Sequence, residues 1–122
     1  MKQGVLVINY KLFDKIDNTS AYSDAYKQKL KDTYLWFKEH GYEFTEHGLN
    51  RVISPKRGKR EFSKEDVLSI LEKPVNYLQG NNKKIKFYDG FSVIQATDTG
   101  EVISFVDNNY KTSENWRERN DG

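Results

Sequence analysis

The residue types that could carry chemistry are concentrated in one stretch, residues 44–60, FTEHGLNRVISPKRGKR. It places His47 one helical turn before Arg51, and the only other histidine of the chain is His40. An imidazole exchanges protons near neutral pH, and a guanidinium can hold a phosphate or neutralise a developing oxyanion. The two residues are therefore a candidate catalytic pair, although the same spacing is also typical of a solvated helix face.

A basic run follows this pair directly. Between Arg51 and Lys64 the only acidic residue is Glu61. Such a run predicts a surface that binds a phosphate backbone, and Gly58 in its middle favours an adaptable loop. A solvated loop or a localisation-type patch has the same composition. The predicted phosphate-binding residues are Lys56, Arg57, Lys59 and Arg60.

Composition limits the remaining possibilities. The chain has 122 residues, which suits one domain, and its net charge of +2 means that nucleic-acid binding depends on local clustering. With no cysteine and two histidines, we expect no disulfide, metal or other cofactor. No apolar run approaches the ~20 residues that span a bilayer, so we expect no membrane anchor in this segment. Residues 1–8 are too short for a signal peptide, which suggests that an exported form would travel within a longer polypeptide.

The elements around residues 44–60 are expected to position the pair. We take residues 1–20 as a linker or N-terminal extension, with a possible strand at 5–10, and residues 21–122 as a single domain. An aromatic stripe predicts a helix over 21–40, capped by Ser20, with His40 at its C-terminal end. A second helix, Glu46–Ser54, begins after a Thr45 cap and ends at Pro55; it puts Leu49, Val52 and Ile53 opposite His47, Arg51 and Ser54. Ser63 and Asp66 form a capping box for a third helix, 64–73.

The C-terminal half is predicted to be a three-stranded meander over 83–88, 91–97 and 101–107. Asp89-Gly90 suits a tight hairpin turn, and the second loop places Gly100 in the left-handed region. If those loop types hold, Ser104 shares one face with Ile85, Ile94 and Val102. A slip of one residue in either loop would reverse the assignment of strand residues to faces. The sequence thus predicts an α+β fold with helices packed on a small antiparallel sheet.

Two further residues have a structural and a functional interpretation. Ser104 interrupts the apolar strand Val102–Val106, where a serine is usually a packing compromise but can also act in catalysis. Trp116 lies in a polar tail, and we expect it to pin the tail to the body of the domain rather than to stack on a base.

Set in order, these pieces resemble the toxin ribonucleases of the barnase, EndoU, colicin and RelE-like superfamily. The resemblance rests on Phe-Thr-x-His-x-x-x-Arg, the basic loop, the Ser-capped helix that ends in Pro, Tyr-x-Gly in the hairpin, and Val-Ile-x-x-x-x-x-Gly-x-Val-Ile-Ser. It covers residues 42–107 and is closest to C-terminal toxin domains of polymorphic and contact-dependent growth inhibition systems.

The resemblance implies roles for individual residues. His47 would be the general acid or base, Arg51 would contact the scissile phosphate, and Ser104 would hydrogen-bond that phosphate. Some relatives use a second histidine, which the meander of this chain lacks. The second proton carrier is therefore open among Lys59, Arg60, Tyr88 and Tyr110, and Tyr88 is also a candidate for substrate binding.

The implied activity is metal-independent RNA cleavage, aimed mostly at transfer RNA. The 2′-hydroxyl attacks the adjacent phosphorus and leaves a 2′,3′-cyclic phosphate. Family members act as antibacterial toxins, are delivered as part of a larger protein into the cytoplasm of a target bacterium, and are held inactive by a cognate immunity protein; no obligate small-molecule ligand is expected. The alternatives are a basic module that binds nucleic acid without cutting it, and a protein-interaction domain.

Overall fold

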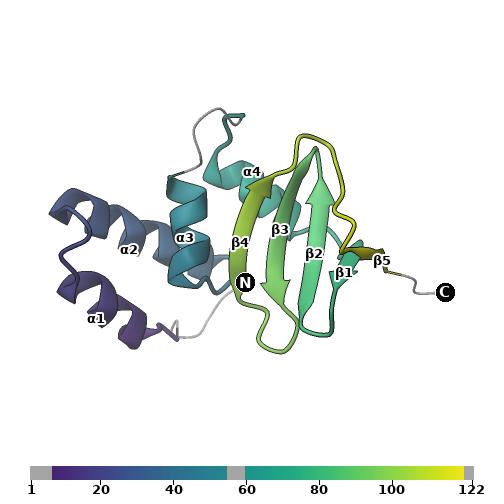
Figure 1. The fold of residues 1–122 in the computed structure, drawn as a ribbon. Coiled ribbons are helices and arrows are strands. Elements are labelled where there is room, and N and C mark those ends of the chain that lie inside the picture. The colour runs from purple at the N-terminus through teal and green to yellow at the C-terminus, as the bar shows by residue number, and fades with distance from the viewer. Residues whose placement is uncertain (1–6, 55–59, 120–122) are drawn as a thin grey trace.

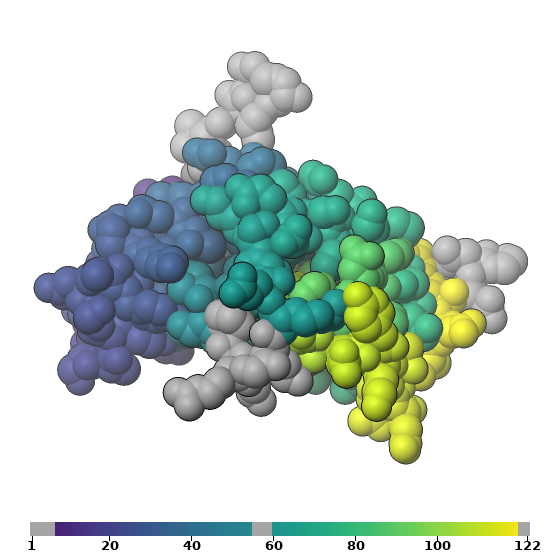
Figure 2. Space-filling view, turned by 90° about the horizontal axis from the view of Figure 1, so that it is seen from above, coloured from purple at the N-terminus to yellow at the C-terminus, as the bar shows by residue number. Residues whose placement is uncertain are grey.

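The computed structural model describes residues 7–54 and 60–119, which form four helices followed by an antiparallel sheet of five strands. The helices pack at one side of the sheet and along one of its edges, and the strand order is β4-β3-β2-β1-β5 (Figure 1). Seen from above, the N-terminal helices lie at one end of the molecule and the C-terminal segment at the other (Figure 2). The elements are α1 (Tyr10–Asn18), α2 (Asp24–Glu39), α3 (Glu46–Ile53), α4 (Lys64–Leu71), β1 (Tyr77–Gln79), β2 (Lys83–Tyr88), β3 (Phe91–Ala96), β4 (Val102–Asp107) and β5 (Arg117–Glu118).

Two predicted helix starts are confirmed by their caps. The Thr45 hydroxyl accepts from the Gly48 amide at 3.1 Å, and Ser63 and Asp66 form a reciprocal capping box. The predicted start of α2 was wrong, because Ser23 rather than Ser20 caps this helix. A serine accepts from an amide only a turn ahead, so α2 begins at Asp24.

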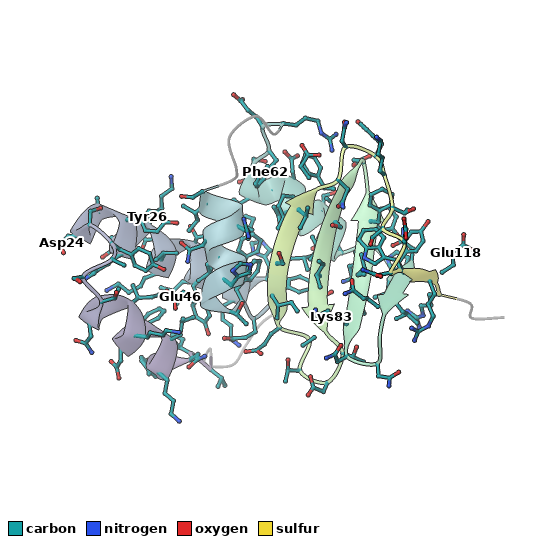
Figure 3. All side chains as sticks on the ribbon, in the orientation of Figure 1. Asp24, Tyr26, Glu46, Phe62, Lys83 and Glu118 are labelled. Atoms are coloured by element: carbon teal, nitrogen blue, oxygen red, sulfur yellow. The ribbon has the colours of Figure 1, made fainter. Side chains whose placement is uncertain are left out.

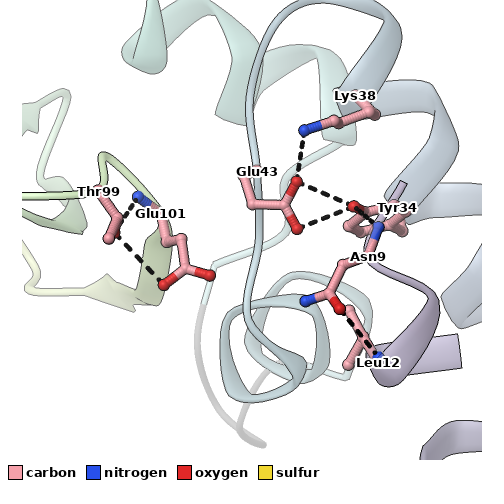
Figure 4. Close-up of polar contacts among 7 residues, drawn as sticks. All are labelled: Asn9, Leu12, Tyr34, Lys38, Glu43, Thr99 and Glu101. Atoms are coloured by element: carbon pink, nitrogen blue, oxygen red, sulfur yellow. Dashed lines mark hydrogen bonds and ion pairs between the residues drawn. The ribbon is translucent and has the colours of Figure 1, made fainter. Parts of the chain in front are cut away.

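The predicted boundary after residue 20 was wrong, because it cuts through the packed domain. The predicted strand at 5–10 was wrong over its described residues, since residues 7–9 form no strand and residues 10–18 form helix α1. Leu12 and Ile16 of this helix are buried in the same core as residues of α2. Tyr34 on α2 secures the start of α1, since its hydroxyl accepts from the Asn9 amide at 3.0 Å and donates to the Glu43 carboxylate (Figure 4). Burial raises the pKa of Tyr34 to about 12.

The predicted meander is confirmed as β2, β3 and β4. Asp89 and Gly90 both have positive φ, 56° and 82°, as a tight hairpin turn requires, and Gly100 has φ 78°. An irregularity between Ile94 and Gln95 places Ile94 opposite Ser104 but Gln95 opposite Val102. This bulge turns Val102 to the helix-covered face, so the prediction that Val102 shares a face with Ser104 was wrong.

The sheet continues beyond the meander. Residues 77–79 and 117–118 add β1 and β5 at one edge, which the sequence did not predict. Trp116 pins the tail as expected: its ring packs against Tyr77 and Phe87, and its Nε1 donates to Gln79 at 3.1 Å. The tail therefore covers part of the sheet face that lies away from α4.

The main core lies between α2, α3, α4 and the opposite sheet face. Val93, Val102 and Phe105 supply the strand side of this core. Lys86 points into the same layer, where it is 9% exposed and its Nζ donates to the Leu71 carbonyl at the end of α4. Burial lowers the pKa of Lys86, since the charged ammonium loses water there.

Candidate active site

Helix α3 runs along the edge of β4 that does not pair with β3, and Phe44, which precedes the helix, forms a parallel bridge with Val102 there. The Thr45 amide donates to the Val102 carbonyl at 3.0 Å, and a Cβ built on Gly48 would lie only 2.3 Å from that carbonyl oxygen. Only glycine permits this approach. The position and the rotation of α3 are therefore set by β4.

The rotation of α3 places the candidate pair on the side of the molecule away from the core. Gly48 and Val52 face the β4 edge and Leu49 faces the core, so His47 and Arg51 lie on the remaining side. Arg51 Nε donates to His47 Nε2 at 3.2 Å. In this arrangement the Nε2 lone pair is the acceptor of the Arg51 hydrogen bond.

The side of α3 opposite the β4 contact is joined to α2 and to the residues just before α2 by a polar network. Tyr22 donates to Glu46, and Tyr26 donates to Asn50 at 2.6 Å. Figure 3 labels two of these side chains, Tyr26 and Glu46. Burial raises the pKa of Tyr22, and the hydrogen bond from Tyr22 lowers the pKa of Glu46. Ser54 joins this network through its hydroxyl, which donates to Tyr26 at 3.1 Å. The prediction that Ser54 projects with the pair was wrong, because the helix ends at Ile53 and the chain turns there.

Ser104 lies on the same side of the sheet as the pair. Its strand partner is Ile94, whereas the next residue, Phe105, is a core residue under α4. Neighbouring strand residues point to opposite faces, so Ser104 faces away from the core, as do His47 and Arg51. Ser104 is half-buried, and its hydroxyl makes no hydrogen bond to residues 7–54 or 60–119.

Arg60, predicted to bind a phosphate, already has an anionic partner. Its amide and its guanidinium both donate to Asp107, with Nη2 to Oδ1 at 2.8 Å, and Nη1 donates to the Asp89 carbonyl. The Asp107 side chain is 6% exposed, and the hydrogen bonds from Arg60 hold its pKa well below the usual range. Arg60 thus joins the segment before α4 to the end of β4.

The structure does not bring Tyr88 to the pair. Its hydroxyl donates to the Pro74 carbonyl at 2.6 Å, and its ring packs against the core on the helix-covered side. The remaining predicted phosphate-binding residues, Lys56, Arg57 and Lys59, lie outside the described residues.

His40 is held at the C-terminal end of α2, as expected. Its Nδ1 bonds the Trp36 carbonyl at 2.8 Å, and the two rings lie 4.5 Å apart. The sequence reasoning missed the partners of the site: Asp107, which holds Arg60, and the network of Asn50 with Tyr22 and Tyr26. Glu46 and Asn50 are one helical turn apart in the sequence, as are Tyr22 and Tyr26. This matching spacing was the feature of the sequence that could have predicted the network.

No family model matches the chain, and neither the curated proteins nor the solved structures searched contained a similar one. Within residues 7–54 and 60–119, no helix is both long and apolar enough to cross a membrane. The same residues contain no group of three or more His, Asp or Glu side chains placed to hold a metal ion.

Proposed function

We propose that this chain is a metal-independent RNA endonuclease of the barnase, EndoU, colicin and RelE-like type. The observation that carries the proposal is the His47–Arg51 hydrogen bond on the exposed side of α3, next to the sheet face that bears Ser104. A proton acceptor, a permanent cation and an available hydroxyl are the groups that phosphodiester transesterification needs. The succession of helices and an antiparallel sheet agrees with this type of fold.

In the proposed mechanism the RNA phosphate takes the place of His47 at Arg51. The guanidinium then neutralises the phosphate, Ser104 donates its hydroxyl proton to a phosphate oxygen, and His47 Nε2 is free. His47 removes the proton of the ribose 2′-hydroxyl, whose oxygen attacks phosphorus while the bond to the 5′-oxygen breaks. The products are a 2′,3′-cyclic phosphate and, once the leaving oxygen has gained a proton, a 5′-hydroxyl.

The leaving oxygen needs a second proton donor. Of the candidates, Arg60 is bound to Asp107 and Tyr88 to the Pro74 carbonyl. Tyr110 follows β4 at the end of the strand away from Val102 and α3, so the role falls to Lys59 in our proposal. It is tested by Lys59→Met, which removes only the acidic group.

We further propose that the enzyme is an antibacterial toxin domain, delivered within a larger protein to the cytoplasm of a target cell and directed at transfer RNA. Such a domain needs a cognate immunity protein in the producing cell, and an acidic surface would suit the basic residues at 56–60. Induced expression of the chain in bacteria should arrest growth, whereas expression of the His47→Ala variant should not.

Incubation of the purified chain with total RNA in EDTA tests the activity directly. We expect shortened RNA with cyclic phosphate ends, and a loss of ~10²-fold or more in cleavage rate for His47→Ala. His40→Ala is the matched control, because His40 is bound to Trp36 outside the site. Arg51→Ala should lose both rate and affinity, since a guanidinium on the phosphate stabilises ground state and transition state alike.

The outcome also separates the proposal from its alternatives. A nucleic-acid-binding module would retard RNA in a gel without shortening it, and a protein-interaction domain would leave RNA unchanged. Cleavage by His47→Ala at the parent rate would contradict the proposed site.

A further inference from the structure

Tyr110 stands on a strained turn directly after β4. It is 66% exposed, which is unusual for a large aromatic side chain, and its φ of 67° lies in the left-handed region. Asn109 before it has φ 51°, a conformation that asparagine tolerates and that a bulky residue rarely adopts. The turn is fixed by two hydrogen bonds, from the Asn109 amide to Asp107 and from the Asn108 amide to the Gly90 carbonyl, both 2.9 Å.

A rigid column supports the Tyr110 ring. The Arg60 guanidinium lies 4.5 Å from the centre of this ring and 4.0 Å from the centre of the Phe91 ring. Phe91 in turn stacks on Phe105, with ring centres 5.3 Å apart and planes 21° apart. A Cβ on Gly90 would lie 2.6 Å from Arg60 Nη2 and 2.9 Å from the Tyr110 amide. The strained turn and Gly90 thus hold an exposed aromatic ring against a support, Arg60 and Phe91, that is anchored in the core.

We infer that Tyr110 is a stacking platform for an unpaired nucleobase of RNA. The inference rests on the proposed function for the identity of the ligand, RNA. It adds the place on the protein where one of the RNA bases is held. Asp107 compensates the charge of Arg60, so the flat ring rather than the cation is the recognition element. The flanking Asn109 and Lys111 are polar. Among residues 7–54 and 60–119 the only other exposed large hydrophobic side chains are Val7 and Tyr10 at the N-terminal end, so the described residues add no apolar patch of the kind that marks a protein interface.

The platform lies within reach of the candidate active site along β4. Val102 contacts α3 beside His47, and Asp107 at the other end of the strand holds the turn. Five strand steps cover about 16 Å, a distance that a few nucleotides span. An RNA strand running in the direction of β4, past the side of the sheet that bears Ser104, would therefore place a base some nucleotides away from the scissile phosphate on Tyr110.

The test measures binding separately from cleavage, with a fluorescently labelled single-stranded 2′-O-methyl RNA that lacks the attacking hydroxyl. We expect Tyr110→Ala to weaken binding by about tenfold, as the loss of one stacked base predicts, and Tyr110→Phe to bind like the parent. Tyr10→Ala is the matched control, because Tyr10 is equally exposed, at 66%, on the first turn of α1.

A second RNA of the same length, with abasic positions throughout, shows whether the ring acts on bases. The parent should bind it less tightly than the normal oligonucleotide, and Tyr110→Ala should bind it as the parent does. Equal affinity of Tyr110→Ala and the parent for the normal RNA would overturn the inference and leave the ring to a protein partner. Binding without cleavage of ordinary RNA would contradict the ribonuclease proposal while leaving the platform standing.

Discussion

Replacing Gly48 with alanine sets local helix propensity against tertiary packing. In an exposed helix the change stabilises by about 1 kcal/mol, because glycine has more freedom to lose on folding. In this protein the new Cβ would lie 2.3 Å from the Val102 carbonyl oxygen, where real Cβ contacts essentially never fall below 3.0 Å. We therefore expect Gly48→Ala to destabilise the domain.

The size of the effect follows from the geometry. The helix and the strand must separate by about 0.7 Å, which is an overpacking cost of about 1–3 kcal/mol. The separation also stretches the 3.0 Å hydrogen bond from Thr45 to Val102, which contributes about 1 kcal/mol. After the gain in propensity, the free energy of unfolding should fall by about 1–3 kcal/mol.

Urea unfolding followed by circular dichroism measures this difference. Ser69 is exposed on α4, so the pair Ser69→Gly and Ser69→Ala gives the propensity difference between glycine and alanine in this protein. Subtracting it from the Gly48→Ala value isolates the clash. If Gly48→Ala unfolds at a higher urea concentration than the parent, α3 does not lie against Val102 as described, and the placement of His47 and Arg51 is then wrong.

Three further predictions concern charge and pH. Tyr34→Phe should reduce the loss of stability between pH 10 and 12. The folded-state pKa of Tyr34 is raised to about 12, so its contribution to the free energy of unfolding is complete below pH 10 and is lost as the pH rises. Urea unfolding at each pH measures this contribution. Asp107→Asn should lower the melting temperature at pH 7 and remove part of the loss of stability below about pH 4. The pKa of Asp107 is depressed in the folded state, so its stabilising contribution is present above the unfolded-state pKa and is lost as the pH falls. The same loss of stability at low pH in the variant and the parent would contradict this. Replacing Lys56, Arg57 and Lys59 with Gln should reduce the slope of log affinity for single-stranded RNA against log salt by about 2, at 0.7 for each lost phosphate contact, and an unchanged slope would mean that the run is only solvated.

Local signals accounted for the features that the sequence predicted correctly. A cap such as Thr45 or Ser63 bonds an amide within one turn, and Asp89-Gly90 supplies two positive φ angles by itself, so neighbouring residues suffice to identify them. The His47–Arg51 contact is of the same kind, since residues four apart on a helix always lie on one side.

Some elements were missed because their stability is not local. Helix α1 buries only Leu12 and Ile16 fully, and both belong to the core cluster that also contains residues of the other helices and the sheet. Strands β1 and β5 have three and two residues, too few for a pattern; β1 pairs with the edge of β2, and β5 pairs with the edge of β1. The bulge opposite Gln95 is equally invisible in the alternation of residue types, yet it decides that Val102 faces the core.

The sequence by itself determined which residues can do chemistry: a lone His–Arg pair on one helix, a serine in an apolar strand and a basic run. Tertiary structure alone decided how they are used, because contacts between distant segments set directions and partners. The contact of Gly48 with Val102 turns the pair toward the side of Ser104. Asp107, far along the chain, binds the Arg60 guanidinium. Arg60 therefore has an anionic partner within the protein instead of an RNA phosphate, and its guanidinium supports the Tyr110 ring. Spacing along a sequence cannot show such a partner, because folding brings the two residues together only through the packing of the whole domain.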